Sequence, residues 1–470
     1  MSATATTEKK YLKWYQKLAY GSGDLASNCS YGLVSSFVLL YLTGTLGLDS
    51  AIIGSLMLAS KVLDGISDVI FGTLIDRTHS KLGKARPWML FGQVGVSLCL
   101  FLLFAIPAGS TTMQYIYFFI VYTALNAVFY TANGIAYSSL VALITKNNNE
   151  RVQLGSFRFM FAVVTNIFMG FAVTGMVEKF GSGAAGWRTT ALIFAIVGLV
   201  VNTISCLAVK ELPEEELSGN TSEAAEEGKA VAKEKKHGFA ETAKILVHNK
   251  YYLMILAIYI VYYIMSNLTT GAGVFCATYY WGDGSLLGQF SMMKMFPVII
   301  ALAIAPVLIK KTGSMQKVNF WGYAISSVLG IPMIYFAMQK NLSMFLLFMF
   351  IKGVFAGTLS GSLNALIAEA SGYTTRTTGV HMDGMMYSCS SLGVKVGGGI
   401  GTAAVGWLLK LGGFVGTATV QSESAIRMIF NLYITFPFVI GIIITVLLAF
   451  LDVEKANKKW DAEHQKEAQA

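Results

Sequence analysis

The sequence predicts an all-α membrane protein with twelve transmembrane helices in two halves of six. Three observations support this fold class. Of the 470 residues, 54% are hydrophobic and only 13% are charged, whereas soluble proteins carry roughly a quarter charged residues. The mean hydropathy is +0.59. Apolar runs of the roughly 20 residues that cross a bilayer recur along almost the whole chain, and one polar stretch divides them into two equal sets.

The first half contains six predicted spans, each placed to within about four residues. They fall near residues 18–44, 50–75, 88–107, 113–144, 153–177 and 188–209. The basic start of the chain leads into an apolar segment that is too long for a signal peptide and has no small-residue cleavage site. We therefore expect the first span to remain in the mature protein.

The second half again contains six predicted spans. They fall near residues 251–279, 286–310, 318–338, 343–370, 378–410 and 425–451. The two halves resemble each other weakly, since residues 72–78 (GTLIDRT) after the second span correspond to residues 306–312 (PVLIKKT) after the eighth. This similarity indicates duplication of a six-helix unit. Paired six-helix repeats are typical of alternating-access transporters that bind their substrate near the bilayer midplane.

A polar segment separates the halves. Residues 211–249 contain the run ELPEEELSGNTSEAAEEGKAVAKEKKHG, which has too few large apolar side chains to form a core. We interpret it as a flexible, partly helical cytoplasmic linker. The predicted organisation is thus an N-terminal segment 1–17, a bundle 18–210, the linker 211–249, a second bundle 250–452 and a tail 453–470.

The net charge of +9 describes orientation in the membrane and does not indicate a nucleic-acid partner. Basic residues concentrate in every second loop, which predicts that both termini are cytoplasmic. They include Arg77, Lys81, Lys84, Arg86, Lys146, Arg151, Lys310, Lys311, Lys317 and Arg376. The five cysteines lie at scattered positions in apolar segments without a CxxC pair, so they are interpreted as packing residues.

Asp64 and Asp68 form the clearest chemical signal in the chain. An ionisable group at the bilayer centre costs at least about 2.5 to 3.5 kcal/mol, so it requires a partner, a wet cavity or a role. Four residues apart, the two carboxylates share one helix face and repel each other unless a cation or proton lies between them. This predicts a coupling-cation site. The alternative is a structural triad, because Lys61 shares the face and can neutralise the acids.

Two charged residues elsewhere in the first half have equally open roles. Asp24, in the first span, is expected either to contact substrate or to form a salt bridge at a helix end. Arg158, early in the fifth span, is always charged and is expected either to clamp substrate or to form a cytoplasmic gate. Asn28, one turn after Asp24, can bond sugar hydroxyls without a charge, although a polar contact between helices has the same signature.

The fourth span carries a dense polar and aromatic run that suits a sugar, with hydroxyls for its hydroxyls and rings for its apolar face. Its members include Tyr130, Thr131, Asn133, Tyr137, Ser138 and Ser139. The alternative is hydrogen bonding between helices. Thr131 is also a candidate third oxygen beside Asp64 and Asp68, because hard cations prefer oxygen ligands.

In the second half, Lys395 lies among glycines (residues 393–399, GVKVGGG) that permit close helix approach, and it is expected to reach the midplane. Lys352 is a further intramembrane candidate. Glu369, near a cytoplasmic end, is interpreted as an ion-pair latch. His381 and Asp383 flank the start of the eleventh span, where a lone histidine is more often structural than a proton relay.

Residues 61–90 (KVLDGISDVIFGTLIDRTHSKLGKARPWML) resemble the glycoside-pentoside-hexuronide:cation symporter family. The resemblance rests on the Asp-x3-Asp helix, the Gly-x3-Asp-Arg loop of Asp76 and Arg77, and the Gly-Lys-x-Arg-Pro segment. Residues 20–24 (YGSGD), Arg151, Arg158 and residues 373–395 carry similar features, so the resemblance extends over most of the chain.

The resemblance implies a major facilitator fold, in which Asp64, Asp68 and Thr131 bind Na⁺, Li⁺ or H⁺. It also implies that Lys395 links the cation and sugar sites, and that Arg158 lies within one residue of a helix-five arginine of the family. We expect Lys61, Asp76, Arg77, Glu369 and Asp383 to act in coupling or gating. We expect no cofactor and no nucleic-acid partner. We expect the protein to function as a monomer in the cell membrane.

Several positions depart from the melibiose-type members of this family. The two acids of their sugar site are replaced by Asn28 and Gly134, and aromatic partners are replaced by Ser138 and Ser360. A less negative cavity that keeps Arg158, Lys61 and Lys395 would tolerate a hexuronide. A neutral disaccharide or pentoside is an equally good expectation.

Two other classes of protein remain as alternatives. A membrane enzyme is disfavoured because the spans contain no HExxH motif, no Ser/His/Asp grouping and no histidine cluster. A cation-coupled carrier of lipids or other amphipathic solutes would share the fold but require an apolar cleft. The polar content of the first and fourth spans argues mildly against that carrier.

Overall fold

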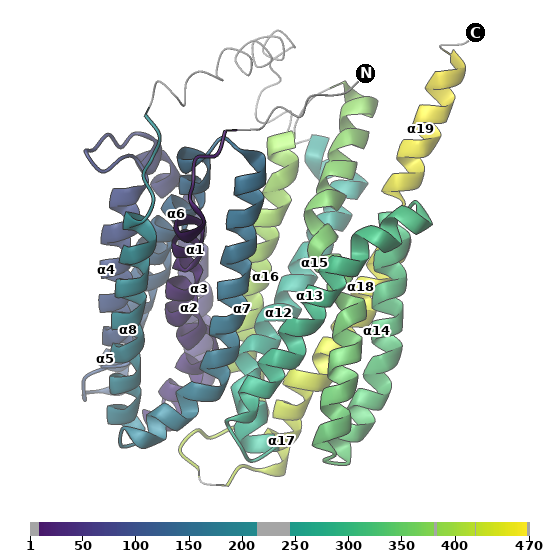
Figure 1. Ribbon diagram of the computed structural model, residues 1–470. Helices are drawn as coiled ribbons and strands as arrows, with labels where there is room; N and C mark the ends of the chain where they lie inside the picture. The colour runs from purple at the N-terminus through teal and green to yellow at the C-terminus, as the bar shows by residue number, and fades with distance from the viewer. Residues whose placement is uncertain (1–8, 214–244, 380–382, 419, 468–470) are drawn as a thin grey trace. The chain divides into compact units, whose positions relative to one another are not determined.

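The computed structural model describes residues 9–213, 245–379, 383–418 and 420–467, and every regular element in these ranges is helical (Figure 1). The chain divides into two units, Met1–Leu48 with Ala59–Lys236, and Asp49–Leu58 with His237–Ala470. Eleven described helical segments are long and apolar enough to cross a membrane. The second predicted span, α3 (Ser50–Asp76), is not one of these eleven; it is a 27-residue helix that carries four charged residues.

The first unit contains the first six predicted spans, except for the first residues of α3. The opening span consists of α1 (Trp14–Gly21), α2 (Gly23–Leu40) and the π-helical turn η1 (Tyr41–Thr45). The fourth span is likewise composite. After α3, the elements are α4 (Arg86–Leu103), α5 (Thr111–Thr123), η2 (Ala124–Tyr130), α6 (Thr131–Ile144), α7 (Asn148–Lys179) and α8 (Gly183–Leu207).

Small residues allow close packing in the first unit, where α2 packs against α7 and α8, and α4 packs against α6 and α8. A Cβ on Gly21 would lie 2.6 Å from Phe157 Cβ, and one on Gly23 would lie 2.8 Å from the Tyr137 ring. The Gly-Ser-Gly motif of the first span is thus explained by close helix approach. Tyr20 and Tyr137 are fully buried in the apolar cluster at this end of the unit.

The second unit contains the last six predicted spans. Its elements are α12 (Lys250–Phe275), η3 (Cys276–Tyr280), α13 (Leu286–Thr312), α14 (Met315–Met338), α15 (Leu342–Thr378), α16 (Asp383–Leu411), α17 (Glu423–Phe430), η4 (Asn431–Thr435), α18 (Phe436–Phe450) and α19 (Val453–Glu467). Glycines of α16 face α12, and a Cβ on Gly393 would lie 2.4 Å from Tyr259 Cβ. The predicted close approach of this glycine stripe is confirmed.

Most predicted spans agree with the helices, and the largest differences lie at polar ends. The tenth predicted span stops at residue 370, whereas α15 continues to Thr378 and ends where Gly379 adopts a φ of 69°. The fifth and sixth helices each begin five residues before the predicted positions, at Asn148 and Gly183. Hydropathy detects only the apolar part of a helix, while backbone hydrogen bonding and capping carry the helix into water.

The predicted tail and the edges of the predicted linker also contain ordered structure. Residues 453–467 of the tail form α19. Within the linker, Leu246 is buried and Asn249 caps α12 by accepting from the Tyr251 and Tyr252 amides. Linker residues 214–244 lie outside the described residues. The predicted linker boundaries at residues 211 and 249 thus fall next to residues with defined contacts, and the linker itself stays a prediction.

The two units repeat one capping device. In the first, the Glu211 carboxylate accepts from the amides of Lys84, Ala85 and Arg86 at 2.7, 3.0 and 3.1 Å, at the start of α4. In the second, the Glu454 carboxylate accepts from the amides of Met315 and Gln316 at 2.8 and 3.0 Å, at the start of α14. In each half, a glutamate shortly after the sixth span caps the N-terminus of the third span. This repeat supports the predicted duplication.

Candidate functional site

The carboxylate of Asp64 meets the hydroxyl of Thr131 inside the first unit. Thr131 is the first residue of α6, directly after the π-helical turn η2, and Asp64 lies in the middle of α3. The Thr131 hydroxyl lies 2.7 Å from Asp64 Oδ1 and 2.9 Å from the carbonyl oxygen of Asn126. A hydroxyl has one hydrogen, so it donates to one of these two acceptors at a time.

Lys61 lies on the other side of the same carboxylate. Its Nζ is 3.6 Å from Asp64 Oδ2, and the two side chains are 18% and 13% exposed. The same ammonium lies 5.9 Å from the centre of the Tyr31 ring. Lys61 therefore supplies one positive charge to the face of α3 that carries Asp64 and Asp68. The contact between Lys61 and Asp64 is compatible with both interpretations, a cation site and a structural triad.

Asp68 follows Asp64 by one helical turn on α3 and is partly buried. Its spacing places it on the same face of the helix. Among the described residues no group of three His, Cys, Asp or Glu side chains is arranged to hold a metal ion. A cation held here would therefore depend on two carboxylates together with hydroxyl and carbonyl oxygens, as hard cations permit.

Asp24 and Arg158 form an ion pair in the first unit. Arg158 Nε lies 2.5 Å from Asp24 Oδ2, with 25% and 18% of the side chains exposed. The guanidinium also covers the Tyr137 ring, 4.1 Å from its centre. The Tyr137 hydroxyl donates to the Tyr20 carbonyl at 2.8 Å and lies 3.3 Å from Asp24 Oδ2. The pair is thus held by three elements, α2, α6 and α7.

A second polar group lies one turn further along α2. Asn28 Nδ2 donates to the Asp24 carbonyl at 2.7 Å, and Asn28 Oδ1 accepts from Asn166 Nδ2 of α7 at 2.9 Å. One turn beyond, the Tyr31 and Tyr130 rings stack with centroids 5.6 Å apart. Tyr130 adjoins Thr131 in sequence and Tyr31 faces Lys61, so this aromatic pair connects the Asn28 region to the Asp64 group.

The remaining predicted site residues lie elsewhere. Asn133 is buried, and its Nδ2 donates to the Met89 carbonyl at 3.0 Å and to Gln93 Oε1 at 3.1 Å, as in the helix-packing alternative. Tyr137 is likewise buried, with its hydroxyl on backbone and Asp24. Asp76 and Arg77 are exposed at the end of α3. A Cβ at Gly134 would have no atom within 4 Å.

In the second unit, Lys395 is partly buried on α16. Asn457 of α19 donates to Glu369 Oε2 at 2.9 Å and to the Glu369 carbonyl at 3.0 Å. A neutral amide thus contacts Glu369 where an ion-pair latch was expected. The side chain of Asp383 and the whole of His381 lie outside the described residues.

One polar and aromatic group, which we call the polar wall, consists of Asn28, Asn166, Tyr31 and Tyr130. Two of its residues were missed in the sequence. Tyr31 follows Asp24 by seven positions and Asn28 by three, so all three share a face of α2. Asn166 follows Arg158 by eight positions and shares its face of α7. Helical spacing counted from the charged residues would have found both.

The chain matches the model of the MFS/sugar transport protein family over residues 19–455. It is 26% identical over 466 residues to an isoprimeverose transporter of Lactiplantibacillus pentosus, covering 98% of this chain and 93% of that protein. It is 23% identical over 408 residues to a glucuronide carrier protein homologue of Escherichia coli strain K12, covering 86% and 85%.

A crystal structure of a D-xylose-proton symporter has the same fold. Its TM-score is 0.64 at 12% sequence identity, covering 94% of this chain and 98% of that one. These findings define the class, a multi-pass membrane transporter with the major facilitator fold. The chain belongs to the MFS/sugar transport protein family, and its expected place among the glycoside-pentoside-hexuronide:cation symporters is confirmed.

Proposed function

We propose that the chain carries a glycoside into the cell together with a cation bound by Asp64, Asp68 and Thr131, by alternating access. The observation that supports this proposal most directly is the contact between the Thr131 hydroxyl and the Asp64 carboxylate at 2.7 Å, on the helix that forms the second predicted span. Oxygen atoms of three side chains supply the hard ligands that Na⁺ requires, and the same carboxylates serve a proton.

The two acceptors of the Thr131 hydroxyl suggest how the site responds to an ion. Without a cation, the hydroxyl donates to Asp64. When a metal ion takes the carboxylate, the hydrogen turns to the Asn126 carbonyl, 2.9 Å away, and a lone pair of Thr131 faces the ion. The π-helical turn η2 supports this arrangement, because it brings the carbonyl five residues back to the Thr131 side chain.

Lys61 acts as the counter-charge of the cation-free state. Its ammonium partly neutralises Asp64, so an arriving cation must compete with it. As the cation takes its place, Lys61 moves toward the Tyr31 ring, which it already faces. Since Tyr31 stacks on Tyr130, ion binding changes the aromatic wall beside Asn28. Cation and sugar then favour each other's binding by reciprocal linkage.

The sugar contacts Asn28, Tyr130 and the rest of the polar wall, with Asp24 and Arg158 held as a pair at its edge. Asn28 and Asn166 supply amides for sugar hydroxyls, and the tyrosine pair supplies an apolar face. Gly134 stands where related carriers place an acid, and a Cβ at this position would have no atom within 4 Å. The distribution of basic residues supports a cytoplasmic position for both termini in the cell membrane. A functional monomer is part of the same proposal.

Uptake into vesicles tests the cation site. Thr131→Val removes the hydroxyl and should abolish gradient-driven accumulation, whereas Thr131→Ser should keep it. Thr73→Val is the matched control, because the Thr73 hydroxyl is exposed on α3 and donates to a backbone carbonyl at 2.8 Å. Equal accumulation in Thr131→Val and Thr73→Val would refute the role of Thr131. Full uptake in the Asp64→Cys, Asp68→Cys double variant would refute the site itself.

The same vesicles identify the ion and the sugar. A panel of labelled neutral glycosides and glucuronides is offered under a Na⁺ gradient at fixed pH, and then under a pH gradient without Na⁺. A sodium-coupled carrier responds to the first gradient and a proton-coupled carrier to the second. Uptake that responds to neither gradient would contradict coupled transport.

A further inference from the structure

The second unit contains a cavity with two lysines in its wall. Its volume is about 190 Å³, and it lies among α12, α13, α14, α15 and α18. Lys294 comes from α13 and Lys352 from α15, and none of the described residues that line the cavity is an Asp or Glu. All the lining residues belong to this unit, and none of them is a member of the Asp64 group.

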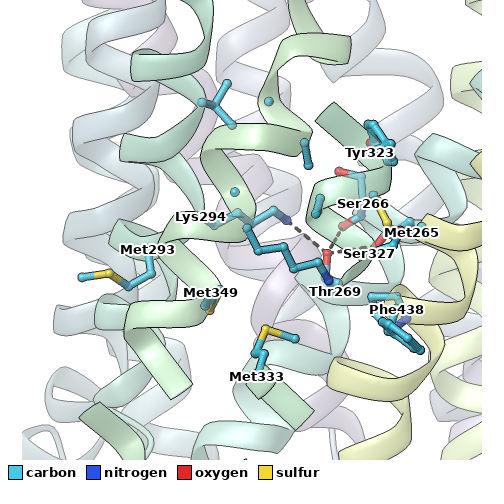
Figure 2. Close-up of a pocket in the computed structure, with 18 of the residues that line it drawn as sticks. Met265, Ser266, Thr269, Met293, Lys294, Tyr323, Ser327, Met333, Met349 and Phe438 are labelled. Carbon is cyan, nitrogen blue, oxygen red and sulfur yellow. Dashed lines mark hydrogen bonds between the residues drawn. The ribbon is translucent and has the colours of Figure 1, made fainter. Parts of the chain in front are cut away.

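Lys294 has only neutral partners in the described part of the chain. Its ammonium donates to the hydroxyl oxygens of Thr269 and Thr270 at 3.2 and 3.1 Å. Both hydroxyls already donate to backbone carbonyls, Thr269 to Met265 and Thr270 to Ser266. They therefore meet the lysine as acceptors and do not cancel its charge. Figure 2 shows Lys294 extending toward Thr269, with Ser266 and Ser327 beside it.

Lys352 adds a second positive charge to the same cavity. The Lys352 side chain is partly accessible. Within the described residues of the second unit, Lys352 forms no salt bridge. An ammonium held in the apolar part of a membrane protein costs several kcal/mol unless a counter-charge or water compensates it. Two in one cavity also repel each other. A bound anion removes both costs at once.

The remaining wall indicates which anion fits. Ser266, Ser326, Ser327 and Tyr323 contribute hydroxyls, and Phe438 contributes an apolar ring. The volume is below the roughly 300 to 1,000 Å³ of pockets for drug-sized ligands, so it suits one sugar-sized ring or a smaller molecule. Lysine ammonium groups bind carboxylates as point charges. Methionines in the wall, including Met333 and Met349, are flexible enough to adapt to its apolar part.

We propose that this cavity is a carboxylate-binding site in which Lys294 and Lys352 hold one anionic group and the neighbouring hydroxyls hold the rest of a small ligand. Two sources share this chemistry. The carboxylate belongs either to an acidic sugar that is carried, an assignment that rests on the proposed transport function, or to a free small carboxylate that binds as an effector. The residues of this cavity are different from those of the cation site.

Binding to the purified full-length protein tests the site with three probes, glucuronate, glucose and acetate. Calorimetry and thermal unfolding should detect glucuronate, and glucose, which lacks the carboxylate, should bind at least tenfold more weakly. Lys294→Met and Lys352→Met should each weaken glucuronate binding at least tenfold while the protein still unfolds cooperatively. Lys311→Met removes a charge from the exposed end of α13 and should leave binding unchanged.

The probes distinguish the sources. Binding of both acetate and glucuronate identifies a free-carboxylate site, whereas binding of glucuronate alone identifies an acidic-sugar site. In the second case Lys352→Met should lose glucuronide uptake and keep uptake of neutral glycosides. Failure of both acids to bind, equal binding of glucose, or unchanged glucuronate binding in the Lys294→Met, Lys352→Met double variant would overturn the proposal.

The carboxylate site and the proposed function can fail separately. Without the coupling cation, Thr131→Val and the parent protein should bind glucuronate equally, because Thr131 is not among the residues that line the cavity. Loss of coupled uptake with intact glucuronate binding would therefore concern the cation site alone. Intact coupled uptake without any carboxylate binding would refute the cavity and leave the symporter in place.

Discussion

Individual charges in this protein are stabilised by specific partners, and the partner determines the role. Asp24 and Arg158 were equally good candidates for substrate contact and for a gate. In the structure Arg158 Nε is 2.5 Å from Asp24, and its guanidinium lies over Tyr137. Both charges are thus largely satisfied within one bundle. A substrate that binds Asp24 or Arg158 must therefore compete with the ion pair between these two residues.

Removing one member of that pair should destabilise the protein more than removing both charges. Asp24→Asn leaves the Arg158 guanidinium, three-quarters buried, without its counter-charge, which costs about 2 to 3 kcal/mol. The Asp24→Asn, Arg158→Gln double variant should recover most of this loss. Thermal unfolding of the purified variants measures it. If the double variant is less stable than Asp24→Asn, the pair is not the main partner of either charge.

Outside the spans, Asp49 predicts a dependence of stability on pH. Its Oδ2 lies 2.6 Å from Lys410 Nζ. Burial raises the pKa of Asp49, but the hydrogen bonds from Lys410 and from the Ala51 and Ile52 amides outweigh this effect and hold the pKa below its ordinary value. The native state then binds a proton less readily than the unfolded state, so the contribution is complete above about pH 4 and is lost as the pH falls through the native pKa.

Asp49→Asn should therefore lower stability at pH 7 by about 0.5 kcal/mol, since Lys410 is exposed. The difference from the parent protein should shrink as the pH falls below about 4. Unfolding midpoints of both proteins across this range measure the effect. A difference that stays constant down to pH 3 would contradict the assignment to ionised Asp49.

At the scale of elements, the helices of each half are joined by devices that hydropathy does not detect. The first and seventh spans both end in five-residue π-helical turns, η1 and η3, and a longer one, η2, precedes Thr131 in the fourth span. Such turns are frequent at functional sites. Glu211 and Glu454 cap the third span of their own halves by binding its first amides. These repeated devices fix helix ends to each other.

The caps should contribute measurably to stability. Glu454→Ala removes an acceptor and a negative charge from the N-terminus of α14 and should cost about 1 to 2 kcal/mol. Glu454→Gln keeps an acceptor oxygen and should cost less. Glu463→Ala is the matched control, because Glu463 is exposed on the same helix, α19. Thermal unfolding that ranks Glu454→Ala with Glu463→Ala would show that the cap is energetically silent.

At the scale of the whole molecule, the chain is built from two units that each have their own apolar core. One core gathers around Tyr20 and Tyr137, and the other around Tyr251 and Tyr323. Alternating access requires each half to remain intact while the halves rock against each other. Separate cores meet that requirement, because the clustered residues of each core all belong to one unit.

Cutting the chain in the predicted linker should therefore preserve transport. Fragments 1–228 and 229–470, co-expressed, should reconstitute glycoside uptake, and neither fragment alone should transport. The control is a cut between Gly357 and Thr358, which interrupts α15 within its bundle and should abolish uptake. Fragments that accumulate in the membrane without restoring uptake would show that the linker does more than connect the halves.

The sequence was sufficient for much of the fold and part of the site. Span number and the charged residues follow from local composition, because the cost of placing polar groups in lipid does not depend on the neighbouring helices. Asn133 shows the limit. Its residue type suits a sugar contact, but its amide bonds Met89 and Gln93 of α4. Lys294 was overlooked, although its charge in an apolar segment was the available signal.

By itself, the sequence determined the helical class, the six-plus-six organisation, the transporter family and the acidic pair of α3, since each depends on residue type and spacing along one helix. The tertiary structure decided which side chains meet across helices. It brought Thr131 to Asp64, Arg158 to Asp24, and Lys294 and Lys352 into one cavity. Spacing defines a face of a helix, whereas the packing of neighbouring helices decides what that face contacts.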